Sequence, residues 1–167
     1  MKTVKKYLFI AALFFITIPA IGQESSVSST GGPSDSHKNM TIVDGLYKAF
    51  AEGNIPAVLG AMDANVVWNE AEGNAYADGN PYIGPEAVLN GVFGRIMQEH
   101  EYFNLKDIEL HEMSNGKVLA TLRYDAKFKN GKSYNAQVAH LWSLKNGKVV
   151  TFQQYADTKK LHEAMAK

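Results

Sequence analysis

Three Asn-Gly pairs in the last third of the chain constrain the fold more than any other feature of the sequence. Each pair separates two runs in which apolar and polar residues alternate, at Asn115-Gly116, Asn130-Gly131 and Asn146-Gly147. Asn-Gly between such runs is a strong hairpin signal, because both residues accept the positive φ of a type I′ turn. The pattern predicts a four-stranded antiparallel meander, with strands at about 102–113, 117–129, 132–144 and 148–155.

The segment before the meander has helical rather than alternating periodicity. Apolar residues recur every three or four positions, and Gly and Asn-x-Pro signals punctuate them. These signals predict helices at 42–53, 54–62 and 84–96, a strand at 64–70 and a short C-terminal helix after Asp157. Helices followed by a meander indicate an α+β domain, with the helices packed on one face of a curved antiparallel sheet.

The N-terminus has the three-part pattern of a secretory signal peptide, which we assign to residues 1–22. Lys2, Lys5 and Lys6 form a basic start, residues 7–18 are almost entirely apolar, and Ala20-Ile21-Gly22 supplies a small-x-small cleavage site. The apolar run is shorter than the roughly 20 residues of a membrane span. We therefore expect an exported protein, periplasmic or secreted, with no stable membrane anchor after cleavage.

Composition indicates the domain organisation and the net charge of the mature chain. Residues 23–39 are rich in Ser and Gly and predict a flexible linker, which leaves 40–167 as one domain. Removing the three lysines leaves 14 basic against 17 acidic residues, a net charge of −3. This mildly acidic balance, with no basic run, argues against nucleic acid as a partner. The absence of cysteine rules out disulfides and thiol catalysis.

Three local stretches resemble one known superfamily. They are YKAFAEGNIPAVL at 47–59, VVWNEAEGNAYADGNPYIGPEAVLNGVF at 66–93 and HLWSLKNGKVVTFQQYADT at 140–158. With the order of elements, they resemble the SnoaL-like branch of the nuclear transport factor 2-like superfamily, which includes ketosteroid isomerases, polyketide cyclases and limonene-epoxide hydrolases. The resemblance implies a conical half-barrel whose internal pocket binds a small apolar organic molecule. It also implies a homodimer formed through the outer face of the sheet.

Glu70 and His140 are the candidate catalytic residues. Glu70 shares a strand face with Trp68, so a pocket lined by Trp68 would desolvate the Glu70 carboxylate and raise its pKa, as a general base requires. His140 lies on an otherwise apolar strand face. The resemblance places the protonated aspartic acid of the isomerase oxyanion hole at His140, where a neutral imidazole could donate a hydrogen bond or shuttle a proton. The resemblance puts the isomerases' catalytic base at Trp68 or, with a two-residue shift, at Glu70. Their oxyanion tyrosine aligns with Leu46, one residue before Tyr47. Both departures disfavour steroid isomerisation by the standard residues.

The pocket walls are expected to be aromatic, with a few polar groups. The candidate substrate-binding residues are Trp68, Tyr82, Tyr124, Trp142 and Gln154. The thirteen-residue loop 71–83 is long for a compact domain and predicts a lid, with Tyr76 or Tyr82 touching the ligand.

Two functions remain open from the sequence. One is cofactor-free acid–base catalysis of the isomerase, cyclase or hydrolase type. The alternative is a non-catalytic protein, either a secreted small-molecule binder or a dimeric interaction module. No metal site is expected, because His111 is followed by Asn115 where a zinc-binding helix would place its second histidine.

Overall fold

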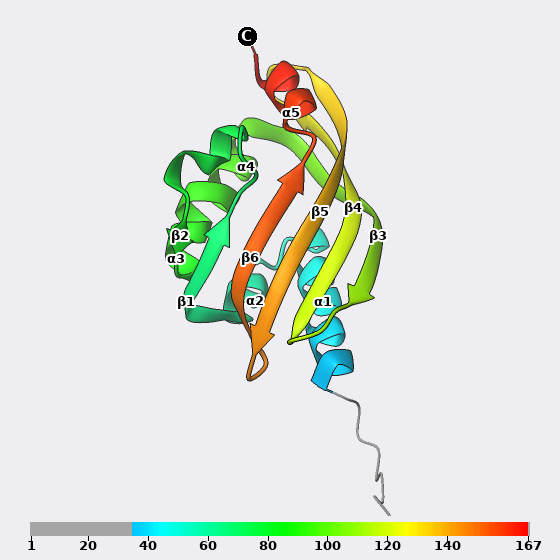
Figure 1. The fold of residues 1–167 in the computed structure, drawn as a ribbon. Helices are drawn as coiled ribbons and strands as arrows, with labels where there is room; N and C mark the ends of the chain where they lie inside the picture. Colours follow the sequence, from blue (N-terminus) through cyan, green and yellow to red (C-terminus); the bar gives the residue numbers. More distant parts are fainter. Residues whose placement is uncertain (1–34, 167) are drawn as a thin grey trace, which may run out of the picture. The chain divides into compact units, whose positions relative to one another are not determined.

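The computed structural model describes residues 35–166 (Figure 1). The signal peptide and residues 23–34 of the expected linker therefore lie outside the described residues. The elements, in chain order, are α1 Asp35–Ala51, α2 Ile55–Gly60, β1 Met62–Asn69, η1 Ala75–Gly79, β2 Tyr82–Ile83, α3 Pro85–Val88, η2 Leu89–Phe93, α4 Gly94–Glu99, β3 His100–Glu112, β4 Lys117–Phe128, β5 Ser133–Lys145, β6 Lys148–Ala156 and α5 Thr158–Met165. Helix α1 begins at Asp35, so it includes residues 35–39, which the sequence assigned to the linker.

Six strands form one open sheet in the order β2-β1-β6-β5-β4-β3. Strands β3 to β6 are the predicted antiparallel meander. Strand β1 lies parallel to β6, with Trp68 opposite Phe152, so the sheet is mixed. The helices and the curved sheet confirm the predicted α+β class. The two-residue strand β2, which pairs with β1, was not anticipated.

The meander turns differ in geometry although their sequences match. Asn115-Gly116 and Asn146-Gly147 both have two residues with positive φ, as a type I′ turn requires. In the third turn only Gly131 has positive φ. The Asn130 side chain accepts a hydrogen bond from the Lys132 amide and donates one to the Ala164 carbonyl of α5. Its side chain thus ties this turn to the C-terminal helix.

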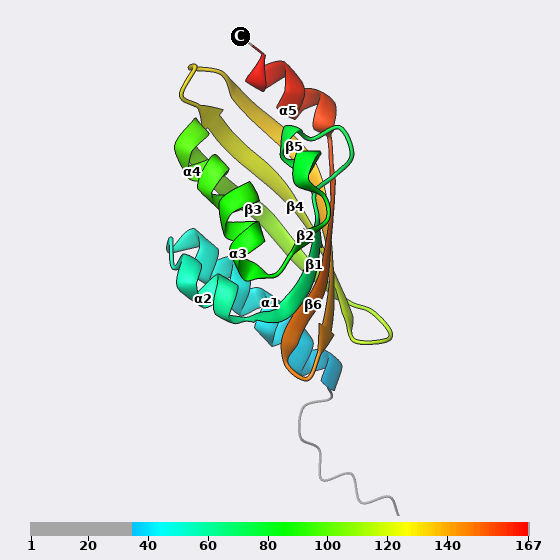
Figure 2. The same cartoon turned by 90° about the vertical axis from the view of Figure 1, so that its left-hand side faces the viewer.

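The helices α1 to α4 cover one face of the sheet and leave the opposite face without a helical layer (Figure 2). The hydrophobic core lies between the helices and the sheet face that they cover. Along β4 and β5 every second residue is buried, because successive side chains of a strand point to opposite faces. The buried face of β5 consists of Tyr134, Ala136, Val138, His140, Trp142 and Leu144, as the alternation predicted.

The segment between β1 and β3 is built from short pieces. It contains the 3₁₀ helix η1, the strand β2, and a helix that starts at Pro85 as predicted and changes to π-helical hydrogen bonding over Leu89–Phe93. π-helical turns inside α-helices are rare and occur frequently at functional sites. Here the turn contributes Val92 and Phe93 to the core. No helix among residues 35–166 is both long and apolar enough to cross a membrane.

Candidate functional site

A small cavity of about 50 Å³ lies inside the domain, between the sheet and the helices. Most of its wall is apolar and aromatic, and side chains from β1, β3, β4, β5, β6, α1, η1, η2, α4 and α5 contribute to it. The lining residues are Phe50, Trp68, Glu70, Asn74, Tyr76, Val92, Phe93, Ile96, Phe103, Leu105, Tyr124, Tyr134, Phe152, Gln154 and Leu161. A volume of this size holds one or two water molecules, since a water occupies roughly 30 Å³ in the liquid.

Glu70 is the carboxylic acid of the cavity wall. It follows β1 directly and shares the buried face of Val66 and Trp68, which leaves it only 2% exposed. Trp68 Nε1 donates to Oε1 over 2.7 Å, and Asn74 Nδ2 donates to Oε2 over 3.0 Å. Burial raises the pKa of Glu70 to about 7, although these donors favour the charged form. The group can therefore both bind and release a proton near neutral pH.

A chain of hydrogen bonds leads from Glu70 to β4 and β6. The Asn74 amide nitrogen also donates to Gln154 Oε1 over 3.0 Å, and the Ala71 backbone amide donates to the same oxygen over 3.2 Å. Gln154 Nε2 then donates to the Tyr124 hydroxyl over 2.9 Å. Residues about 80 positions apart in sequence are thus joined in one buried network.

The same network continues from Tyr124 to His140, which does not line the cavity. The Tyr124 hydroxyl is 2.7 Å from His140 Nε2, and the Tyr47 hydroxyl is 2.8 Å from His140 Nδ1. Trp142 Nε1 donates to the Tyr47 hydroxyl over 3.0 Å. Burial lowers the pKa of His140 to about 3, so the imidazole is neutral at physiological pH. A neutral imidazole fits a hydrogen-bonding role better than a proton shuttle at this position.

Three of the five predicted wall residues line the cavity, namely Trp68, Tyr124 and Gln154. Trp68 stacks on Phe152 with ring centroids 3.7 Å apart. Trp142 lies outside the lining, packed edge-on against Trp68 and bonded to Tyr47. Tyr82 also lies elsewhere, because its hydroxyl bonds to the Tyr76 carbonyl over 2.7 Å. Of Glu70 and His140, only Glu70 lines the cavity.

Sequence reasoning missed Asn74 and the role of Tyr47. Asn74 lies four residues after Glu70 in a loop, and nothing local indicates that its amide reaches both Glu70 and Gln154. Tyr47 is buried on α1, adjacent to the position where the resemblance placed the oxyanion tyrosine. That proximity was the available signal, but the hydrogen bond from Tyr47 to His140 depends on how α1 packs on the sheet.

The segment 71–83 folds against α4. Tyr76 lines the cavity, and its hydroxyl donates to Glu99 over 2.5 Å. Arg95 lies over the Tyr76 ring, 4.7 Å from its centroid, and binds Asp78 over 2.7 Å and the Ala75 carbonyl over 3.2 Å. These contacts hold the segment in place and make it one wall of the cavity.

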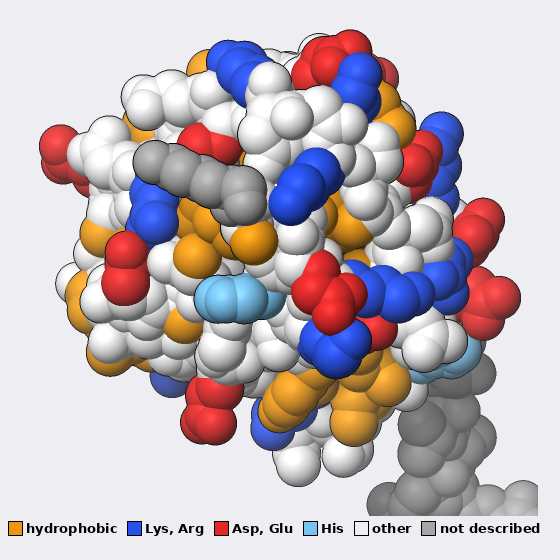
Figure 3. Space-filling view, turned by 90° about the horizontal axis from the view of Figure 1, so that it is seen from above, with side chains coloured by type: hydrophobic (Ala, Val, Ile, Leu, Met, Phe, Trp, Pro, Cys, Tyr) orange, Lys and Arg blue, Asp and Glu red, His pale blue; other side chains and the backbone are white. Residues whose placement is uncertain are grey.

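The end of the molecule at which α5 lies has a mixed surface. Figure 3 looks onto this end and shows hydrophobic side chains among charged ones. Leu161 of α5 and Ile96 of α4 belong to the cavity lining. Helices α4 and α5 therefore contribute apolar side chains to the cavity wall.

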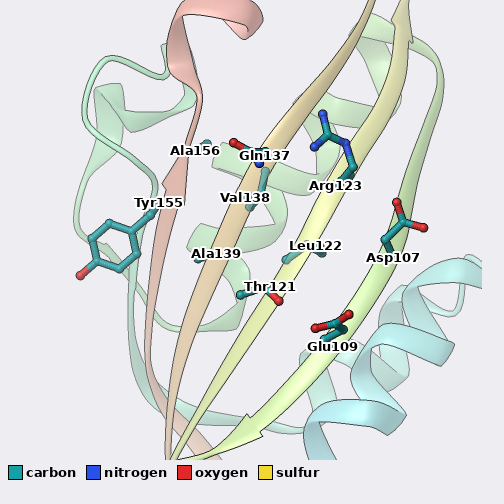
Figure 4. A pocket seen from close by; sticks show the side chains of 10 residues that line it. All are labelled: Asp107, Glu109, Thr121, Leu122, Arg123, Gln137, Val138, Ala139, Tyr155 and Ala156. Atoms are coloured by element: carbon teal, nitrogen blue, oxygen red, sulfur yellow. The ribbon is translucent and has the colours of Figure 1, made fainter.

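A second hollow of about 540 Å³ lies on the outer face of the sheet (Figure 4). It spans β3 to β6 and contains both acidic and basic side chains, whereas Glu70 is the acidic residue of the internal cavity wall and no Lys or Arg among residues 35–166 lines that cavity. Its charged residues are Asp107, Glu109 and Arg123, and Tyr155 at its edge is 55% exposed. Among residues 35–166 no group of three or more His, Asp or Glu side chains is arranged to hold a metal ion.

Several proteins of known structure have a similar fold. A nuclear transport factor 2-like protein from Burkholderia thailandensis is 27% identical, with a TM-score of 0.72, and the match covers 77% of this chain and 98% of that one. A candidate polyketide cyclase from Pseudomonas putida has 18% identity and a TM-score of 0.65 over 77% and 98% of the two chains. A candidate isomerase from Bacillus subtilis has 14% identity and a TM-score of 0.66 over 78% and 94%. The latter two show the fold alone.

The search of curated proteins gave no match. The family model of the SnoaL-like domain matches residues 43–152, from α1 to β6 and including Glu70 and His140. The chain therefore belongs to the SnoaL-like domain family, within the nuclear transport factor 2-like superfamily.

Proposed function

We propose that the Glu70 cavity binds a small apolar carbonyl compound, and that Glu70 transfers a proton at the carbon beside the carbonyl. The observation that carries this proposal is the Glu70 carboxyl itself. It lies on an otherwise mostly apolar wall, and burial raises its pKa to about 7. A base with a pKa near the working pH is the most effective proton-transfer group.

The hydrogen bonds around Glu70 favour proton exchange with a ligand. Trp68 and Asn74 each occupy one lone pair of a different carboxylate oxygen. Each oxygen of a carboxylate has a further lone pair. The carboxylate can use it to take the hydrogen of an acidic C–H bond, whose electrons move into the carbonyl to form an enolate. Return of a proton to the same carbon gives hydrogen exchange. In a ligand with a C=C bond next to the acidic carbon, the intermediate is a dienolate, and return of the proton to the far end of that C=C bond gives isomerisation.

Binding requires the cavity to expand. Pockets for organic ligands typically measure about 300–1,000 Å³, against about 50 Å³ here. The wall made by η1, α4 and α5 consists of three elements of five to eight residues each. Outward movement of Tyr76 with η1 would enlarge the cavity, because Tyr76 forms part of its wall, and this movement would break the contacts of Tyr76 with Arg95 and Glu99.

A small ring ketone tests both parts of the proposal. Cyclohexanone in D₂O exchanges its α-hydrogens, and ¹H NMR follows the loss of their signal. We expect the protein to accelerate this exchange and the Glu70→Gln variant to lose the acceleration. Glu72→Gln is the matched control, since Glu72 belongs to the same loop but is exposed. Saturable quenching of tryptophan fluorescence reports binding separately, because Trp68 lines the cavity.

The non-catalytic alternative uses the same mostly apolar cavity wall. A binder that captures its ligand without chemistry needs the apolar wall but no proton transfer. Saturable binding of cyclohexanone with no acceleration of exchange would support this alternative and refute the assignment of Glu70 as a base.

We propose further that the domain acts after export and as a homodimer. The basic start, apolar run and small-x-small site of residues 1–22 support export, and Edman sequencing of the protein purified from its host should then begin at Gln23. The helix-free outer face, with its hollow and exposed Tyr155, supports association of two copies there.

A further inference from the structure

Two backbone N–H groups fix the direction of the hydrogen bonds in the buried network. The Ala71 amide donates to Gln154 Oε1, so the Gln154 nitrogen must be the atom that donates to Tyr124. The Tyr76 amide donates to Asn74 Oδ1 over 3.1 Å, so the Asn74 nitrogen donates to Glu70. Backbone N–H groups cannot accept. The amide orientations therefore follow from the chain itself.

His140 lies between two tyrosine hydroxyls that each already accept one hydrogen bond. Tyr124 accepts from Gln154, and Tyr47 accepts from Trp142. A neutral imidazole has one N–H and one lone pair. One tyrosine must therefore donate to His140, while the other accepts from it and keeps its own hydroxyl hydrogen for another partner.

The two tautomers of His140 differ because only one of the tyrosines faces the cavity. If Nδ1 of His140 carries the hydrogen, it donates to the Tyr47 hydroxyl, and the hydroxyl hydrogen of Tyr47 then needs another acceptor. The Tyr47 side chain is 6% exposed and does not line the cavity. A buried donor without an acceptor costs about 1–3 kcal/mol. With hydrogen on Nε2, Tyr47 donates to Nδ1 and the spare hydrogen belongs to Tyr124, which does line the cavity.

We infer that His140 holds the Nε2–H tautomer when a ligand is bound, so that Tyr124 donates its hydroxyl hydrogen to an oxygen of that ligand. The inference rests on the proposed function and defines the ligand class more closely. The ligand presents an acceptor oxygen to Tyr124 and an acidic C–H bond to Glu70. Tyr124 is a binding residue, and His140, which does not touch the cavity, is a positioning residue.

The arrangement also makes Tyr124 a good donor to a developing negative charge. Its oxygen accepts from both Gln154 Nε2 and His140 Nε2, and hydrogen bonds in a chain polarise one another. Burial holds the pKa of Tyr124 well above its ordinary value, so the hydroxyl keeps its hydrogen. A donor already oriented towards an enolate oxygen stabilises it without reorganisation.

Two probes of the same shape test the donor role of Tyr124. Cyclohexanone has an oxygen acceptor, whereas methylenecyclohexane replaces this oxygen with a CH₂ group. We expect Tyr124→Phe to weaken cyclohexanone binding by about five- to tenfold, the value of one neutral hydrogen bond. Binding of methylenecyclohexane should change by less than about twofold, since it makes no such bond.

The tautomer is measured directly in the unmodified protein. In ¹⁵N-histidine-labelled protein saturated with cyclohexanone, the His140 ring nitrogens should show the Nε2–H pattern, with the resonances assigned by their loss in His140→Gln. This measurement needs no folded Tyr124 variant.

Each negative result has a distinct meaning. An Nδ1–H pattern in the complex, or equal weakening of both probes by Tyr124→Phe, overturns the inference and leaves ligand binding intact. If the unmodified protein binds neither probe, the proposed function fails, and the inference fails with it.

Discussion

The hydroxyl of Tyr124, a residue that lines the cavity, lies 2.7 Å from Nε2 of His140, a residue that does not. Glu70 lines the cavity, whereas His140 is connected to the cavity lining through its hydrogen bond with Tyr124. The two titratable groups thus belong to one hydrogen-bonded network but have different access to a ligand. Burial favours the neutral form of both groups, because it raises the pKa of Glu70 and lowers the pKa of His140.

These opposite shifts predict an unusual dependence of stability on pH. Between pH 4.5 and about 7 the folded protein retains the Glu70 proton that the unfolded chain releases, so the free energy of unfolding falls as pH rises. Between about pH 3 and 6.5 the unfolded chain protonates His140 and the folded protein does not, so the free energy of unfolding rises with pH. The two effects oppose each other from pH 4.5 to 6.5.

Glu70→Gln should remove one of these opposing effects. We expect the stability of the unmodified protein, relative to the variant, to fall by about 3 kcal/mol from pH 4.5 to 7. Urea unfolding at a series of pH values measures the difference. Parallel stability curves for the two proteins would show that Glu70 titrates at an ordinary pKa.

Arg95 is predicted to stabilise the wall formed by η1. Replacing it with Met removes the ion pair with Asp78, the bond to the Ala75 carbonyl and the cation on the Tyr76 ring. We expect amide hydrogen exchange at Ala77 and Asn80 to become about five- to tenfold faster, because opening of this segment becomes easier by about 1 kcal/mol.

The matched control for Arg95 is Lys127→Met, which removes the ion pair with Glu101. Exchange at Ala77 and Asn80 should not respond to this variant. If both variants accelerate exchange to the same extent, a general loss of stability explains the effect, and Arg95 does not hold the wall specifically.

Gly91 is predicted to be required for packing of Tyr82. A Cβ atom at position 91 would lie 2.0 Å from Cε1 of Tyr82, whose ring is buried and held by the Tyr76 carbonyl. We expect Gly91→Ala to lower the free energy of unfolding by about 2 kcal/mol, a typical cost of overpacking. Gly45→Ala provides the contrast. It lies in α1 with no atom within 4 Å of a Cβ, so it should stabilise by about 0.5–1 kcal/mol. Equal effects at both positions would contradict the packing argument.

The sequence predicted those parts of the fold that local signals specify. Alternation placed Trp68 and Glu70 on one face and His140 and Trp142 on another strand's inner face, and burial agrees at all four positions. The pairing of β1 beside β6 has no local signal, because it joins residues 80 or more positions apart. The small size of the cavity could not be predicted either, since it depends on how side chains from ten elements fill one space.

The outer face of the sheet provides the last prediction. Ala139 lies on the outer hollow, between Thr121 and Tyr155 of the neighbouring strands. If two copies associate there, Ala139→Arg places a long charged side chain from each copy in the interface. We expect sedimentation equilibrium to show a dimer for the unmodified protein and a dissociation constant raised at least about a hundredfold for the variant, because like charges brought together cost several kcal/mol. Lys48→Glu, on the exposed side of α1, should leave the dimer unchanged. A dimer that tolerates Ala139→Arg would place the interface on another surface.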